Sequence, residues 1–170
     1  MKKIIKSLFL ISASTLSHAQ STNTITVNSG ELHILPNTVV STHFDFDNQS
    51  SGVVFNDGEF QFYKNYNNDG LFTHSTNLTS GYTVFQGAEN QVISGSEPSK
   101  HFDVLFYNSS GQYPFNLNSD MIVNGIANFR DGIVKINKNL GGQLLFGNGS
   151  SHMNANDKSY AEGMVEKLGD

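Results

Sequence analysis

The sequence predicts an all-β protein, and within that class a right-handed parallel β-solenoid that is β-helix-like. Two observations indicate the strands: apolar and polar residues alternate with period two, and turn dipeptides separate the alternating segments at short intervals. Asn and Gly are also abundant, and both tolerate the backbone conformations of tight turns. An antiparallel β-sandwich is the alternative, because periodicity alone does not separate the two folds.

Apolar residues that share a parity mark the expected strands and their core-facing side chains. In chain order they are Ile25 and Val27, Leu32 and Ile34, Val40 with Phe44 and Phe46, Val53 and Phe55, Phe60 and Phe62, Phe102 with Val104 and Phe106, Val134 and Ile136, and Leu144 and Phe146. Only residues 157–168 also fit a helix, with one apolar face.

Turn dipeptides separate these strands. They are Ser29-Gly30, Ser51-Gly52, Asp57-Gly58, Asp69-Gly70, Ser80-Gly81, Ser94-Gly95, Ser110-Gly111, Asn124-Gly125, Asp131-Gly132 and Asn148-Gly149. Three further features favour the solenoid over the sandwich. Asn side chains at turns can stack in ladders between coils, the strand faces are mostly Phe, Val and Ile, and no Pro falls inside a strand pattern.

The first 19 residues have the pattern of a cleavable secretory signal peptide. Lys2, Lys3 and Lys6 precede an apolar stretch that is too short to span a bilayer, and Ser17-His18-Ala19 predicts cleavage before Gln20. We therefore expect a protein that is exported through the inner membrane to the cell surface or beyond, with no transmembrane segment after signal removal. The expected divisions are residues 1–19 as signal, 20–156 as a β-solenoid-like domain, and 157–170 as the start of a following, missing segment.

Charge and cysteine content exclude several functions. Without residues 1–19 the chain keeps 7 basic and 15 acidic residues, a net charge of −8. Nucleic acids and anionic membranes are bound by clustered Lys and Arg, so neither is an expected partner. The sequence contains no Cys, so packing and backbone pairing hold the fold without disulfides.

His43, Asp45 and Asp47 are the candidate metal ligands. On a strand, residues at i, i+2 and i+4 leave the same face, where imidazole and carboxylate groups suit a weakly bound divalent cation. A polar solvent face opposite a Phe core explains the same pattern without a metal ion.

Outward-facing Tyr residues are the candidate ligand surface. Tyr63 follows Phe62 and Tyr107 follows Phe106, so each is expected to face solvent, and Tyr66, Tyr82 and Tyr113 are further exposed candidates. Such a surface suits an extracellular polysaccharide or a cell-surface partner, although scattered surface Tyr residues are common.

No catalytic residues and no cofactor are expected. The basic residues are scattered, and no pair of carboxylates stands out for polysaccharide cleavage. The sequence Gly149-Ser150-Ser151-His152-Met153 approaches a nucleophile elbow but has Met at the second Gly position.

Several segments together resemble a known family. They are GYTVFQGAENQVISGS (81–96), HFDVLFYNSSG (101–111), LNSDMIVNGIANFRDGIVKIN (117–137), SGELHILPNT (29–38), GVVFNDGEFQFYKNYNNDGLF (52–72) and SHMNANDKSYAEGMVEKLGD (151–170). They are similar to the β-solenoid, adhesin-like repeat region of large surface proteins exported by the type IX secretion system. The resemblance implies a secreted, non-enzymatic structural or adhesive protein, a fragment of a longer adhesin-like molecule. A carbohydrate-binding or polysaccharide-cleaving β-helix module is the alternative.

Overall fold

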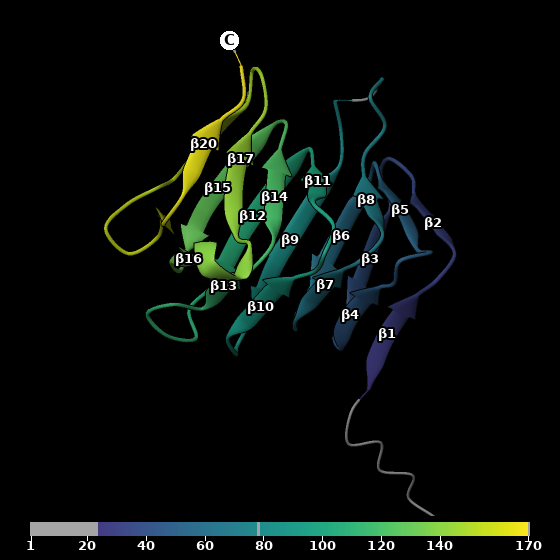
Figure 1. Ribbon diagram of the computed structural model, residues 1–170, viewed down its shortest axis with the longest axis horizontal. Helices are drawn as coiled ribbons and strands as arrows, with labels where there is room; N and C mark the ends of the chain where they lie inside the picture. Colours follow the sequence, from purple (N-terminus) through teal and green to yellow (C-terminus); the bar gives the residue numbers. More distant parts are fainter. Residues whose placement is uncertain (1–23, 78, 170) are drawn as a thin grey trace, which may run out of the picture.

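The chain folds into a parallel β-solenoid whose backbone passes through three sheets in each coil. The structure is a computed structural model that describes residues 24–77 and 79–169. The expected signal peptide, residues 1–19, lies outside the described residues. Figure 1 shows the coils side by side along the longest axis, from β1 (Ile25–Asn28) to β20 (Val165–Lys167).

Each sheet takes one strand from every coil. Sheet A has the order β1, β4 (Asp45–Asn48), β7 (Tyr66–Asn68), β10 (Gln91–Ser94), β13 (Phe115–Leu117), β16 (Val134–Ile136) and β19 (Ala161–Glu162). Sheet B has the order β2 (Glu31–Ile34), β5 (Val53–Asn56), β8 (Leu71–Thr73), β11 (Ser99–His101), β14 (Asp120–Val123), β17 (Gln143–Phe146) and β20. Sheet C has the order β3 (Val39–Thr42), β6 (Glu59–Phe62), β9 (Tyr82–Gly87), β12 (Asp103–Asn108), β15 (Ile126–Asp131) and β18 (Ser151–Met153). A short 3-10 helix, η1 (Lys138–Leu140), connects β16 to β17.

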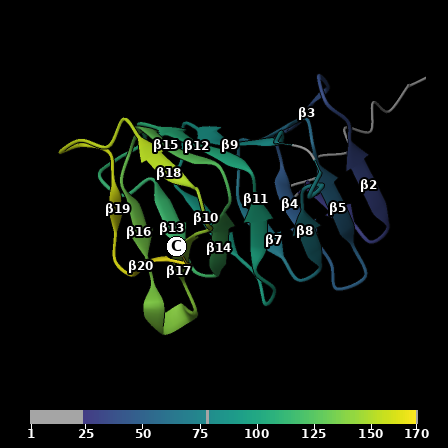
Figure 2. The same ribbon diagram turned by 90° about the horizontal axis from the view of Figure 1, so that it is seen from above.

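The strand pairing confirms a solenoid. Each strand from β1 to β17 pairs in parallel with the strand three places later in the chain, which belongs to the next coil, as β3 does with β6 and β9 with β12. Six coils are complete, and β19 and β20 begin a seventh (Figure 2). The antiparallel sandwich is therefore wrong.

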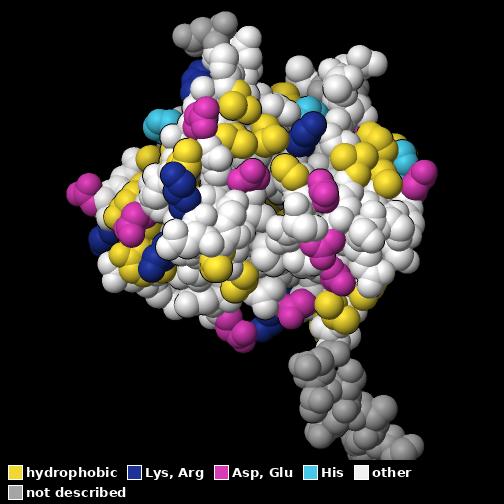
Figure 3. All heavy atoms as spheres, in the orientation of Figure 1, with side chains coloured by type: hydrophobic (Ala, Val, Ile, Leu, Met, Phe, Trp, Pro, Cys, Tyr) yellow, Lys and Arg dark blue, Asp and Glu magenta, His cyan; other side chains and the backbone are white. Residues whose placement is uncertain are grey.

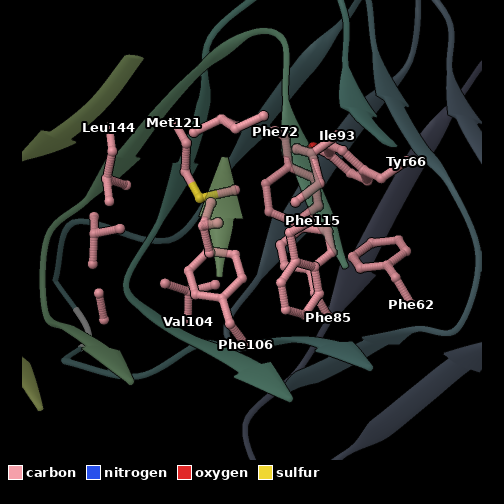
Figure 4. Packing of buried hydrophobic residues seen from close by; sticks show 14 of the residues in the cluster. Phe62, Tyr66, Phe72, Phe85, Ile93, Val104, Phe106, Phe115, Met121 and Leu144 are labelled. Atoms are coloured by element: carbon pink, nitrogen blue, oxygen red, sulfur yellow. The ribbon is translucent and has the colours of Figure 1, made fainter. Parts of the chain in front are cut away.

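Aromatic side chains fill much of the interior. Phe62, Phe85, Phe106 and Phe129 lie opposite one another in register along sheet C, and the ring centroids of successive pairs are 5.4, 5.8 and 5.5 Å apart. The interplanar angles are 22°, 12° and 13°, so the four rings form one stack. Figure 4 shows three of them, Phe62, Phe85 and Phe106. Stacked aromatic pairs contribute about 0.5–1.5 kcal/mol each beyond their burial.

An asparagine ladder joins the first three coils where the strands of sheet A end. Asn28 Nδ2 donates to Asn48 Oδ1 at 2.8 Å, and Asn48 Nδ2 donates to Asn68 Oδ1 at 2.7 Å. Asn48 and Asn68 are fully buried. This arrangement confirms the predicted stacking of Asn amides. The ladder stops at Gly95, whose φ is +138° and where a Cβ would lie 2.0 Å from the Asn68 carbonyl oxygen.

Carboxylates at the corners bind consecutive coils to one another between β4 and β15. In four places an Asp Oδ1 accepts a backbone N–H from the following coil: Asp45 from Asn65 (3.1 Å), Asp57 from Ser75 (2.7 Å), Asp69 from Ser96 (2.8 Å) and Asp103 from Ile126 (2.6 Å). The hydrogen bonds from the Ser96 backbone and hydroxyl lower the pKa of Asp69. Hydrogen bonds to charged groups contribute about 1.5–3 kcal/mol when they are shielded from solvent. They contribute less at an exposed corner such as that of Asp69.

The first strand turns the opposite face inward from the one predicted. Ile25 and Val27 are 51% and 48% exposed, and Thr26 lies in register with inward-facing Phe46. Thr26 Oγ1 is 3.0 Å from Thr42 Oγ1, so two hydroxyl groups cover this end of the core. The expectation that Ile25 and Val27 face the core is therefore wrong, because the end coil has solvent on one side and favours polar groups there.

Further predicted core residues in β5 and before β4 are also displaced. In β5 the inward residues are Val54 and Asn56, and Val53 and Phe55 lie half-buried on the outer face. Phe44 lies at the bend before β4 and is 48% exposed, so the prediction that it shares a core face with Phe46 is wrong. A bend interrupts the two-residue alternation, so parity does not carry across it.

The tail continues the solenoid. Residues 157–169 contain β19, which pairs with β16, and β20, which pairs with β17. The helix considered for residues 157–168 is wrong, because strand pairing with the preceding coil is available there. Within residues 24–77 and 79–169, no helix is long and apolar enough to cross a membrane.

Candidate functional site

The three candidate metal ligands do not form one ligand set. His43 lies at the bend between β3 and β4, and Asp45 and Asp47 lie on β4. Asp45 Oδ1 accepts the N–H of Asn65 at 3.1 Å, and Asp47 Oδ1 accepts the side-chain amide of Asn67 at 2.9 Å. In the part of the chain that the structure describes, no three His, Cys, Asp or Glu side chains are grouped to hold a metal ion.

His43 and Asp45 do meet at one corner hollow between sheets C and A. The hollow has a volume of about 290 Å³ and is also lined by Lys64 and Glu89. Lys64 Nζ is 2.6 Å from Glu89 Oε2, so an ammonium group already pairs with that carboxylate. A divalent cation placed here would be repelled by Lys64, which makes this hollow a poor cation site.

Both candidate ligand-surface residues belong to a single row of side chains at the outer edge of sheet C. This outer row consists of His43, Tyr63, Gln86, Tyr107 and Arg130, one residue from each of five successive coils. The His43 and Tyr63 rings stack with centroids 4.1 Å apart and an interplanar angle of 23°. Gln86 lies in register with Tyr107, and Arg130 Cζ lies 4.9 Å from the Tyr107 ring centroid.

A β-bulge places Arg130 over Tyr107. Between β12 and β15 the register shifts, so that Phe106 pairs with Phe129 but Tyr107 pairs with Asp131. Arg130 is the additional residue between these two pairs. Bulges redirect side chains, and here the redirected guanidinium makes a cation–π contact.

Stacking within the outer row covers ring faces that a sugar would need. His43 lies on one face of Tyr63, and Arg130 lies on one face of Tyr107. Gln86, between the two Tyr residues, donates from Nε2 to Gln61 Oε1 at 3.3 Å. The row therefore presents ring edges, hydroxyls and amides to solvent, and its two stacked pairs join the coil of His43 to that of Tyr63 and the coil of Tyr107 to that of Arg130.

The other Tyr candidates lie elsewhere. Tyr66 is fully buried, so its predicted exposure is wrong, and burial raises its pKa. Tyr82 is half-buried on the outer face of sheet C, and its pKa is raised by burial and then by Glu59 and Asp103. Tyr113 approaches Glu162, which raises its pKa. Five Tyr residues thus occupy four separate environments.

A buried polar cluster in the core was not found from the sequence. His101 is 1% exposed, its Nδ1 is 2.8 Å from Thr83 Oγ1, and its Nε2 is 3.0 Å from Ser99 Oγ. Asn56 Nδ2 donates to Thr83 Oγ1 at 3.2 Å, which extends the cluster to three coils. Burial, with a smaller contribution from His74, lowers the pKa of His101 to about 3. A neutral imidazole held between two hydroxyls is suited to structural hydrogen bonding. The signal that could have revealed it was the parity of Ser99 and His101 in SKH, which places both on one face.

Ser150 and His152 near the C-terminal end do not form a nucleophile pair. Ser150 Oγ donates to the carbonyl oxygen of Gly147 at 2.6 Å. Ser150, His152, Val165 and Lys167 help to line a hollow of about 490 Å³ against the last coil. Lys167 Nζ donates to the Ser150 carbonyl oxygen at 3.3 Å. A serine hydroxyl engaged with a backbone carbonyl lacks the base that nucleophilic catalysis requires.

On the face shown in Figure 3, acidic and basic side chains are scattered among small apolar patches. The fold and these contacts define a parallel β-solenoid protein in which successive coils stack strand on strand in three sheets. No known family model matches the chain, and no curated protein or solved structure matches it either.

Proposed function

We propose that this chain is a non-enzymatic structural or adhesive protein that works outside the cell. The observation that carries the proposal is the outer row, because four of its five side chains stack in pairs across coils, His43 on Tyr63 and Arg130 on Tyr107. The fifth, Gln86, donates to Gln61 of the preceding coil. The Asn28–Asn48–Asn68 ladder repeats the same arrangement inside the core. Side chains engaged in holding coils together are suited to a rigid spacer or a presenting surface.

The export route supports the extracellular part of the proposal. The sequence pattern of residues 1–19 is that of a cleavable signal, and several segments resemble adhesin-like repeats of type IX secreted surface proteins. Together they favour a role as a piece of a longer adhesin-like protein at the cell surface. No cofactor is required for such a role.

One observation favours carbohydrate as the partner of the adhesive surface. Tyr63 and Tyr107 lie two coils apart in one row, which corresponds to about 9.5 Å along the axis. Gln86 lies between them, so three successive coils each offer one hydroxyl or amide group in this row. An extracellular polysaccharide lying along the axis would meet this repeating row of hydrogen-bonding groups.

The proposal is tested with the mature chain beginning at Gln20. We expect no release of reducing ends or unsaturated products from a panel of polysaccharides. Release that disappears when one carboxylate is neutralised, as in Glu59→Gln or Asp103→Asn, would overturn the non-enzymatic function. Intact mass of the exported protein tests the cleavage before Gln20.

Polysaccharide binding is tested separately by affinity electrophoresis. The double substitution Tyr63→Ala and Tyr107→Ala should abolish retardation, while Tyr113→Ala, at a different surface, should leave it unchanged. Retardation that both variants retain would exclude the outer row as the binding surface. A chain that no polysaccharide retards would restrict the proposal to a structural role or a protein partner.

A further inference from the structure

The sequence contains two Asn-Gly dipeptides, and the structure places them in opposite environments. They are Asn124-Gly125 and Asn148-Gly149. In an Asn-Gly pair the Gly nitrogen can attack the Asn side-chain amide, because Gly has no side chain to obstruct the approach. Whether the attack occurs depends on the freedom of the side chain and of the following N–H.

The fold immobilises both reacting groups of the first dipeptide. Asn124 Nδ2 is 2.9 Å from His74 Nε2, and Gly125 N donates to the Phe102 carbonyl oxygen at 2.7 Å. The backbone of Gly147 packs on the amide so closely that a Cβ there would lie 2.4 Å from Asn124 Oδ1. The amide carbon of Asn124 cannot meet the nitrogen of Gly125 without local opening of these contacts.

The second dipeptide has neither restraint. Asn148 and Gly149 are both exposed, in the turn between β17 and β18 that Ser150 N closes by donating to the Gly147 carbonyl oxygen at 3.2 Å. Within the described ranges, neither the Asn148 amide nor the Gly149 N–H has a hydrogen-bond partner. Gly149 has a φ of +76°, and no atom lies within 4 Å of the position that a Cβ would occupy.

We propose that Asn148 is a site of spontaneous deamidation and that the fold protects Asn124 from the same reaction. The backbone nitrogen of Gly149, after losing its proton to water or hydroxide, forms a bond to Cγ of Asn148. The bond from Cγ to the amide nitrogen breaks, and that nitrogen leaves as ammonia. Water then opens the cyclic imide at either carbonyl, which gives Asp or isoaspartate at position 148.

The product changes the chain within the last complete coil, between β17 and β18. It adds a negative charge two residues from Ser150, whose carbonyl oxygen accepts from Lys167 Nζ. The isoaspartate form also lengthens the backbone of the turn that leads into β18. The proposal stands on these local contacts and does not depend on the proposed function.

The test incubates the mature chain in oxygen-18 water at mildly alkaline pH, once folded and once in concentrated urea. Trypsin places Asn124 in the fragment 101–130 and Asn148 in the fragment 139–158, and fragment mass spectrometry locates the incorporated label. In the folded chain we expect label at position 148 at least about tenfold faster than at position 124, a ratio that a local opening free energy of about 1.4 kcal/mol produces. In urea the two rates should converge.

Equal rates in the folded chain would overturn the proposal, as would faster reaction at Asn124. A tenfold difference that persists in urea would also overturn it, because the difference would then come from neighbouring sequence and not from the fold. The substitution Asn148→Gln, which slows ring closure, should remove the label from fragment 139–158 of the folded chain. Label that persists at position 148 in this variant would contradict the proposed mechanism.

Discussion

His43 and Tyr63 lie face to face on adjacent coils, with ring centroids 4.1 Å apart. The residue predicted to bind a metal ion thus covers one face of a residue predicted to bind a ligand. Both assignments came from parity along the strand, but the contact runs between coils. Contacts between adjacent coils therefore determine which faces of His43 and Tyr63 remain free to bind a ligand.

Metal removal should leave the stability of the protein unchanged. His43, Asp45 and Asp47 are each engaged with other groups and do not converge, so no tightly bound cation should stabilise the native state through them. Thermal unfolding with a chelator, with added Ca²⁺, and with neither should give the same Tm. A rise in Tm with Ca²⁺ that His43→Ala or Asp47→Asn abolishes would contradict this expectation.

Removal of one amide from the ladder should destabilise the fold strongly. Asn48→Ala deprives the buried Asn68 Oδ1 of its donor and leaves Asn28 Nδ2 with only the Val53 carbonyl oxygen as acceptor. Unsatisfied buried groups cost about 1–3 kcal/mol each, so we expect the free energy of unfolding to fall by about 2–4 kcal/mol. Urea unfolding measures the change. The control is Asn77→Ala at an exposed turn, for which a loss as large as that of Asn48→Ala would refute the role of the ladder.

The aromatic stack gives a second comparison between a buried and an exposed residue of one type. Phe85 is fully buried between Phe62 and Phe106, and Phe44 is 48% exposed. Phe85→Ala should lower the free energy of unfolding by about 3–5 kcal/mol. Phe44→Ala should change it by less than about 1 kcal/mol. Similar losses from both substitutions, measured in urea, would mean that Phe44 packs in the core as the sequence predicted.

The strands and their stacking could be predicted from the sequence wherever only one face of a strand was apolar. Phe60 and Phe62 in EFQF alternate with polar residues, and both are buried as predicted. The segment VVFN of β5 is different, because both parities contain apolar residues. The structure turns Val54 inward together with Asn56, whose amide bonds to Thr83 in the next coil. The alternation of residues along one strand does not reveal a hydrogen-bond partner that lies in the next coil.

Only part of the outer row could be predicted from the sequence. Parity placed Tyr63 and Tyr107 on an outer face, and the structure places them in one row. Their neighbours His43 and Arg130 are 20 and 23 residues away in the chain, and coil length varies, so the sequence does not give their register. The bulge that brings Arg130 onto Tyr107 adds a residue to one coil, a change that alternation along one strand does not reveal.

Stability should decrease in mild acid because of His101. Burial lowers the pKa of this imidazole from 6.5 in the unfolded chain to about 3 in the folded protein. Between these two values the unfolded state binds a proton that the folded state does not bind, so the free energy of unfolding falls as the pH falls from 6.5 toward 3. The slope from this group approaches about 1.4 kcal/mol per pH unit within that window. Urea unfolding at several pH values measures the slope, and His101→Phe, which keeps a ring beside Phe72 and removes the titration, should reduce it by that amount. A slope that His101→Phe leaves unchanged would mean that His101 takes up its proton as easily in the folded protein as in the unfolded chain.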